Sequence, residues 1–172
     1  MANIYKFSVR VPAEYDASLA ETRRTLGLAD LARWRDFYVE AAEPLSTAQQ
    51  QTLCAALGNG LTEIVTLGQP LTPGREVQVA YKRGIVDNEN DSIVALCRLL
   101  DIPATAGKVA TVYQSADARL AELIAGACLN PNIEELHTAE PAYDTLQPAG
   151  FYESMRTFDL RPLDDDGLAE LG

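Results

Sequence analysis

The sequence predicts an α/β sandwich in which two similar units follow each other along the chain. Two observations support this prediction. Segments with the strand-like period of two alternate with segments whose apolar residues recur every three to four positions. The second half of the chain also repeats the order of the first, at an offset of about 72 residues. A chain of 172 residues with 47% hydrophobic content can bury the core that such a fold requires.

The first unit begins with a strand, a helix and a second strand. Apolar and polar residues alternate over 4–11, which is typical of a strand with one buried face. Over 15–26 the apolar residues recur at helical spacing, and Gly27 follows where a helix C-terminus favours a left-handed residue. Residues 32–41 are rich in β-favouring side chains, and because their alternation slips near Asp36 we expect a β-bulge there.

A second helix and a short third strand complete the first unit. Ser46 is a natural N-cap for the helix, and Gln49 three residues later completes a capping-box pair. The glycines within 58–60 end this helix, and 61–67 is predicted to be the third strand. The stretch that follows contains Pro and Gly without any periodicity, so we interpret 69–74 as a linker between units.

The second unit repeats this order, with a strand at 75–83, a helix at 88–101, a strand at 107–114, a helix at 116–128 and a strand at 132–138. A crossover between parallel strands of one sheet is right-handed, and two such crossovers give a ferredoxin-like sandwich. We therefore expect two tandem ferredoxin-like units, with antiparallel or mixed sheets and helices on one face, at 1–68 and 75–138. An extended tail at 139–172 then leads to a helix start.

Charge and composition exclude several classes of partner. The formal net charge is −11, from 14 Lys and Arg against 25 Asp and Glu, which would repel nucleic acid and anionic membrane surfaces. No apolar run approaches the roughly 18 residues of a membrane-spanning helix, so we expect a cytoplasmic protein. Three scattered cysteines, Cys54, Cys97 and Cys128, favour reduced and buried thiols over a disulfide framework.

Few residues suggest catalysis. His137 is the only histidine, and a strand would place it on the same face as Glu135, so a carboxylate–imidazole pair is sterically allowed. The scattered cysteines and this single histidine form no recognisable metal-ligand pattern. The turn at 82–84 places two cations and a glycine before a helix N-terminus, which is at most a weak anion site because acidic residues follow it.

A resemblance to a known family enters at this turn and the helix start after it, where the sequence reads Tyr81-Lys82-Arg83-Gly84-Ile85-Val86-Asp87-Asn88-Glu89. It resembles the strand–Lys-x-Gly-Val-x-Asp–helix signature of the PurS-type small subunit of phosphoribosylformylglycinamidine synthase, and of the N-terminal domain of that enzyme's fused form. The similarity continues over 75–138 and includes Leu129-Asn130-Pro131-Asn132-Ile133-Glu134. Arg83, Ile85 and Asn88 depart mildly from the residues common in the family.

What the resemblance implies is a non-catalytic assembly element of a purine-biosynthesis enzyme. It would hold the glutaminase part against the ATP-dependent synthase part. The complete enzyme uses ATP and Mg²⁺, but none of the residues that bind them can be carried over to this chain, for which we expect no cofactor and no metal. The expected contact residues are Lys82, Arg83, Gly84, Asp87 and Glu89. A homo-oligomer is also compatible with the predicted sheet edges.

Two other classes of function stay open at this point. One is a free-standing small enzyme of ferredoxin-like fold that uses His137 and Glu135. The other is a regulatory module of the same architecture, with a small molecule bound at the seam between the two units. Fold alone does not choose among these alternatives.

Overall fold

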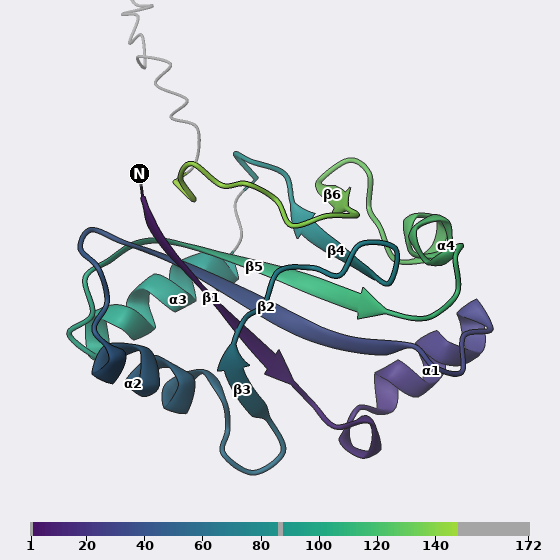
Figure 1. The fold of residues 1–172 in the computed structure, drawn as a ribbon, viewed down its shortest axis with the longest axis horizontal. Helices are drawn as coiled ribbons and strands as arrows, with labels where there is room; N and C mark the ends of the chain where they lie inside the picture. Colours follow the sequence, from purple (N-terminus) through teal and green to yellow (C-terminus); the bar gives the residue numbers. More distant parts are fainter. Residues whose placement is uncertain (1, 86–87, 148–172) are drawn as a thin grey trace, which may run out of the picture.

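Six strands form one continuous antiparallel sheet in the computed structural model, which describes residues 2–85 and 88–147 (Figure 1). The strand order is β3-β1-β2-β5-β4-β6. The strands are β1 (Asn3–Arg10), β2 (Ala32–Ala41), β3 (Ile64–Leu67), β4 (Glu76–Tyr81), β5 (Ala104–Gln114) and β6 (Glu134–His137). Every predicted strand is therefore present, and β2 has the predicted bounds.

The α-helices also lie where the sequence predicts them, whereas the short 3-10 helix η1 before α1 was not predicted. The helices are η1 (Ala13–Tyr15), α1 (Ala17–Leu26), α2 (Thr47–Leu57), α3 (Asn88–Leu99) and α4 (Leu120–Ala127). The capping box of α2 is confirmed, because the Ser46 side chain accepts from the Gln49 amide and the Gln49 side chain accepts from the Ser46 amide. Gly27 ends α1 with φ of 68°, the left-handed conformation expected of it.

The strand order is palindromic, as expected for a duplicated chain. The two halves join where β2 pairs with β5, and in this ladder Phe37 lies opposite Val109, the residue that an offset of 72 assigns to it. An approximate two-fold axis therefore relates the halves near this pair. The α+β class and the antiparallel pairing are confirmed. One shared sheet is present where two tandem ferredoxin-like units were expected.

The predicted parallel crossover is wrong for β1 to β2 and for β4 to β5, because the strands of each pair are antiparallel neighbours. β2 and β3 both pair antiparallel with β1 and therefore run parallel to each other, so α2 connects parallel strands as predicted, and α4 connects β5 with β6 in the same way. A parallel crossover requires the connecting helix to run back along the strands. The ten residues of α1 span only about 15 Å, and this helix lies beside one end of β1 and β2 (Figure 1). The chain therefore re-enters the sheet from the end at which it left.

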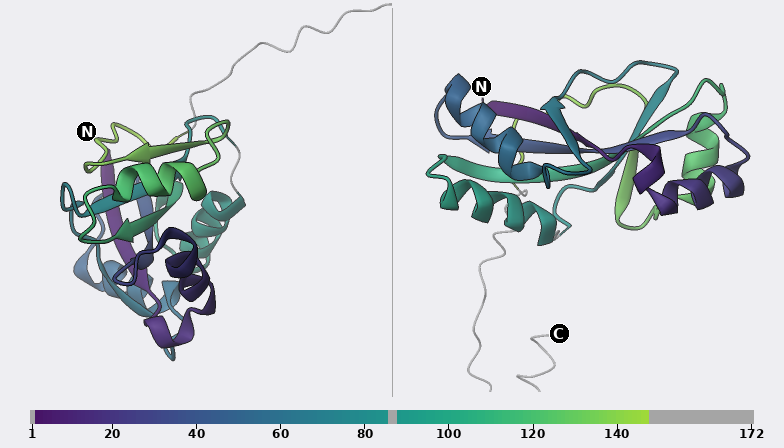
Figure 2. Two further views of the ribbon diagram at one scale, coloured as in Figure 1. Left: turned by 90° about the vertical axis from the view of Figure 1, so that its right-hand side faces the viewer. Right: turned by 90° about the horizontal axis from the view of Figure 1, so that it is seen from below.

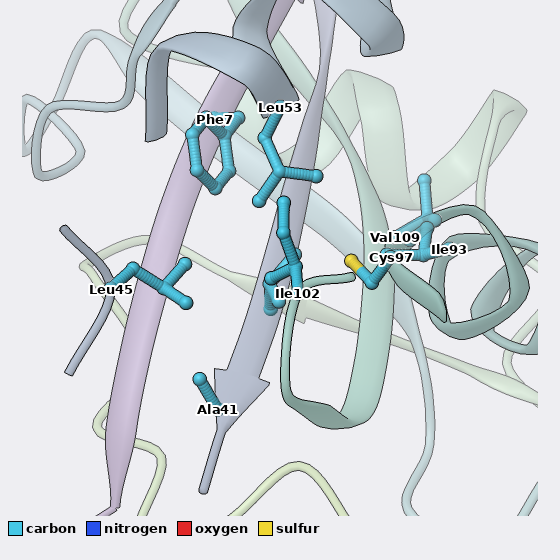
Figure 3. Packing of buried hydrophobic residues seen from close by; sticks show 9 residues of the cluster. Phe7, Ala41, Leu45, Leu53, Ile93, Cys97, Ile102 and Val109 are labelled. Atoms are coloured by element: carbon cyan, nitrogen blue, oxygen red, sulfur yellow. The ribbon is translucent and has the colours of Figure 1, made fainter. Parts of the chain in front are cut away.

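The helices cover one face of the sheet in two clusters, and each cluster combines both halves of the chain. At one end α2 and α3 pack on Phe7, Val39 and Val109 (Figure 3). At the other end α1 and α4 lie side by side over Val77 and Val79 (Figure 2). Because each core takes one helix from each repeat, the two repeats share their buried surface as well as their sheet.

The opposite face of the sheet is covered by two segments without regular secondary structure. Leu71, within the predicted linker, is buried against Trp34 and Val112, so the linker packs as part of the core. Residues 138–147, which we call the covering segment, place Tyr143 and Leu146 against a buried cluster of β2, β4 and β5. The rest of the predicted tail, 148–172, lies outside the described residues.

A buried ionic cluster holds the covering segment on this face. Lys6 Nζ lies 2.9 Å from Asp36 Oδ2 and 2.9 Å from Glu140 Oε2. Asp36 Oδ1 accepts from Ser8 Oγ at 2.6 Å and from Trp34 Nε1 at 3.1 Å. The predicted bulge at Asp36 is wrong, since the register is regular there and shifts only after Glu40. The alternation slips at Asp36 because this buried position carries a charge.

All three cysteines are free thiols. Cys97 is fully buried in the α2–α3 cluster, whereas Cys54 and Cys128 are half-buried and pack against the two helix-covered cores, which agrees with the predicted core packing of all three thiols. Burial raises the pKa of each thiol. Among the described residues, none of the helices has the length and apolar character needed to cross a bilayer.

Candidate functional site

The turn that follows β4 forms a rigid corner at the surface. Lys82 is fixed at both ends, because its amide donates to Ile133 O at 2.8 Å and its Nζ donates to Pro131 O at 2.5 Å. The Ile85 amide closes the turn on Lys82 O at 3.2 Å. Gly84 has φ of 90°, which favours glycine there. Between these fixed points the Arg83 side chain is exposed.

A cleft of about 740 Å³ opens beside this corner. Its walls are residues 81–85, the exposed side of α3, the first half of β5, Glu135 of β6 and residues 142–146 of the covering segment. Gly107 allows α3 to pack this closely on β5, since a Cβ there would lie 3.0 Å from Asn90 O. Asn90 also accepts a hydrogen bond from the Val109 amide at 3.1 Å. The volume is typical of small-ligand sites.

The charges that line the cleft differ from those of the whole chain. Its positive side chains are Lys82, Arg83, Arg98 and Lys108, and its carboxylates are Asp91, Glu135 and Asp144. The cleft is thus close to neutral in a chain of net charge −11. Across the described residues, Arg83 and Arg98 make no hydrogen bond or ion pair, and both are exposed. These two guanidinium groups are available to an anionic partner.

Lys108 joins the floor of the cleft to the covering segment. Its Nζ donates to Tyr81 O at 2.6 Å and lies 5.5 Å from the centre of the Tyr143 ring. Burial raises the pKa of the Tyr143 hydroxyl, and the carboxylates of Glu135 and Glu140 raise it further. Tyr143 therefore stays uncharged at neutral pH, and its ring forms an apolar wall of the cleft.

The structure brings together three of the five residues predicted to form an interface. Lys82, Arg83 and Gly84 line the cleft. Glu89 instead forms an ion pair with Arg35 of β2, so it links the second half of the chain to the first. The fifth residue, Asp87, lies outside the described residues. Lys82 is engaged in structural hydrogen bonds, which leaves Arg83 as the accessible cation of the predicted corner.

The predicted carboxylate–imidazole pair is also present. His137 Nε2 lies 3.3 Å from Glu135 Oε1, and both residues are half-buried in the sheet edge. Glu135 lines the cleft, whereas His137 does not. Within the described part of the chain, His, Cys, Asp and Glu side chains do not gather in groups of three or more. His137 Nε2 is buried and makes no hydrogen bond within the described residues, so the two side chains lie close together without a hydrogen bond between them.

Sequence reasoning missed Arg98, Lys108 and Tyr143. Arg98 lies near the end of α3, well beyond the motif, and Lys108 is the one charged residue of β5. That charge in β5 was the available signal, because a lysine inside a buried strand requires a polar partner. Tyr143 could not have been found from periodicity, since the covering segment has none.

Comparison with known proteins adds no further assignment. The sequence matches no protein-family model, and a search of curated proteins finds no match either.

Proposed function

We propose that this chain is a non-catalytic assembly element of phosphoribosylformylglycinamidine synthase, and that it bridges the glutaminase and the ATP-dependent synthase. The observation that supports the proposal most is the corner at 82–84. Lys82, Arg83 and Gly84, which belong to the stretch that carries the family resemblance, form an exposed turn that presents Arg83 beside a near-neutral cleft. A fixed backbone with an accessible guanidinium suits a hydrated protein interface.

The fold supports the same proposal in a second way. The resemblance implies a domain that corresponds to two small subunits joined in one chain, and the two halves here share one sheet and both cores. The described part of the chain therefore forms one continuous folded unit. It can therefore hold two partners at a fixed separation, as an element that aligns two active sites must do.

The proposal is tested by reconstitution with the synthase and the glutaminase of the same organism. We expect all three to co-elute, and glutamine-dependent turnover to fall at least tenfold without this chain, while ammonia-dependent turnover persists. Arg83→Glu should weaken assembly at least tenfold. Arg75→Glu is the matched control, because Arg75 is exposed, lies outside the cleft and changes the net charge equally. Full glutamine-dependent turnover in the absence of this chain would refute the proposal.

A second candidate function is the binding of a small anionic molecule in the cleft. The observation that favours it is a pair of exposed arginines, Arg83 and Arg98, which have no partner among the described residues and lie on a cavity of suitable size. A thermal-shift screen with purine nucleotides and amino acids would reveal such a ligand as a concentration-dependent rise in Tm. Arg98→Ala should abolish that rise if the ligand lies in the cleft. If no compound raises Tm, the assembly role is the candidate function that remains.

A further inference from the structure

The outer edge of β3 is an exposed strand edge with an apolar surface. β3 is the terminal strand of the sheet, and no other strand of the described residues pairs with its outer side. Ile64 is 57% exposed and Leu67 is 50% exposed, and Leu61 just before the strand is 90% exposed. Unpaired edges with apolar side chains are the ones that bind additional strands.

The hydrogen-bonding groups of this edge point outward at two positions. The Gly68 amide donates to Lys6 O at 2.8 Å, which makes Gly68 and Lys6 a hydrogen-bonded pair of the β1–β3 ladder. Antiparallel ladders alternate hydrogen-bonded and non-hydrogen-bonded pairs. With Leu67 opposite Phe7 and Val65 opposite Val9, both Leu67 and Val65 fall in non-hydrogen-bonded pairs. Their N–H and C=O groups therefore face away from β1, toward the free edge.

An apolar groove of about 470 Å³ lies beside the same edge, between α2 and β3. The α2 wall consists of Thr47, Gln50, Gln51, Cys54 and Ala55, and Val65 and Leu67 form the wall on the β3 side. Glu63 is the one charged residue among those that line the groove. The two residues with outward backbone groups thus also point their side chains into the groove. A strand added at this edge would place its alternate side chains under α2.

The other edge of the sheet provides an internal comparison. β6 occupies the equivalent position in the second half of the chain, and its sequence, Glu134 to His137, contains two carboxylates and a histidine. Charged side chains on an edge strand prevent strand addition. β3 has the sequence Ile-Val-Thr-Leu and carries no such protection. Of two edges related by duplication, one is protected against strand addition and the other is not.

We propose that β3 and the α2–β3 groove bind an extended segment of another protein by strand addition. The segment pairs with the backbone of Val65 and Leu67 and inserts alternate apolar side chains into the groove. It carries no net negative charge, because it approaches a chain of net charge −11 and a groove whose one charged residue is Glu63. This inference does not depend on the proposed assembly role, and the β3 edge is distinct from the cleft.

A second copy of the chain is a poorer occupant of this edge. Two β3 strands would pair over four residues each, which is small beside the roughly 800 Å² per partner of a stable interface. Each copy also brings a net charge of −11. A basic or neutral segment avoids this repulsion and fills the groove with its own side chains.

The test uses the full chain and a fluorescein-labelled probe, acetyl-Lys-Val-Thr-Val-Thr-Val-Lys-amide, in an anisotropy titration. We expect saturable binding to the wild type. Ala55→Glu should weaken binding at least tenfold, because it places a carboxylate in the groove. Ala56→Glu is the matched control and should bind within twofold of the wild type, since Ala56 is also an exposed α2 residue but lies outside the groove. Circular dichroism confirms that both variants fold.

A second probe isolates the backbone contribution. The same peptide with its three valines N-methylated keeps the side chains but loses the N–H donors, and we expect its binding to be lost. Equal binding of both probes, equal effects of the two variants, or no binding to the wild type at 1 mM would each overturn the proposal. So would a concentration-dependent dimer that Ala55→Glu dissociates, because that result would assign the groove to a second copy.

Discussion

Replacing Lys6 with Met tests the buried ionic cluster beneath the covering segment. Lys6 Nζ neutralises Asp36, whose side chain is only 1% exposed, at 2.9 Å. Breaking a buried pair by removing one partner costs about 3–5 kcal/mol, because a charge is left without a counter-ion. The second pair, with Glu140, contributes less, since that carboxylate is 30% exposed and screened by solvent. We therefore expect Lys6→Met to lower the free energy of unfolding by about 3–5 kcal/mol.

Urea unfolding at pH 7 measures this change. Trp34 is the only tryptophan, is 5% exposed and donates to Asp36, so its fluorescence reports on this region, and far-UV circular dichroism provides a second probe. Adding Asp36→Asn to Lys6→Met removes the stranded charge while an oxygen remains to accept from Ser8 and Trp34. The double variant should recover about 2 kcal/mol relative to Lys6→Met alone.

The pH dependence gives an independent check. Burial raises the pKa of Asp36, and the hydrogen bond from Ser8 and the charge of Lys6 offset this only in part. A carboxyl whose folded pKa is raised contributes its stability below the unfolded pKa and loses it as pH rises through the folded pKa. The difference in the free energy of unfolding between the wild type and Lys6→Met should therefore become smaller toward pH 4. If Lys6→Met lowers the free energy of unfolding by less than about 1 kcal/mol at pH 7, the reasoning is refuted. It is also refuted if the double variant is no more stable than Lys6→Met.

Three further predictions concern other parts of the fold. Leu71→Ala should lower the free energy of unfolding by about 2–5 kcal/mol because Leu71 is buried, whereas Leu61→Ala, at a 90% exposed position, should change it little in the same urea titration. Gly107→Ala should lower the free energy of unfolding by about 1–3 kcal/mol, because the new Cβ meets α3. Gly126→Ala should raise it by up to about 1 kcal/mol, because a Cβ at Gly126 has nothing within 4 Å and alanine favours the helix. Both changes are measured as shifts in Tm. Burial alone would raise the pKa of Asp16, but hydrogen bonds, the largest from Arg33, bring it below its ordinary value. The stability that ionised Asp16 contributes is present above about pH 4 and is lost as pH falls through the lowered pKa. Asp16→Asn keeps the N-cap acceptor but cannot ionise, so the free energy of unfolding of this variant should depend less on pH between pH 5 and 2.

The local elements of this protein could be predicted from its sequence. The β-favouring side chains of 32–41 located β2 at its observed bounds, and Ser46 with Gln49 defined the start of α2. These features depend on residues a few positions apart, whose spacing determines which backbone conformation buries them and satisfies their amides. The duplication could be read for the same reason, because it repeats a local pattern.

Only the tertiary structure decided how the halves join and what lines the candidate site. The Lys6–Glu140 contact spans 134 residues, and the Arg35–Glu89 contact spans 54. Periodicity assigns a face to each residue but does not say which distant residue will cover that face. The corner at Lys82 to Gly84 could be found from its motif, whereas the cleft beside it exists only because α3, β5 and the covering segment meet there.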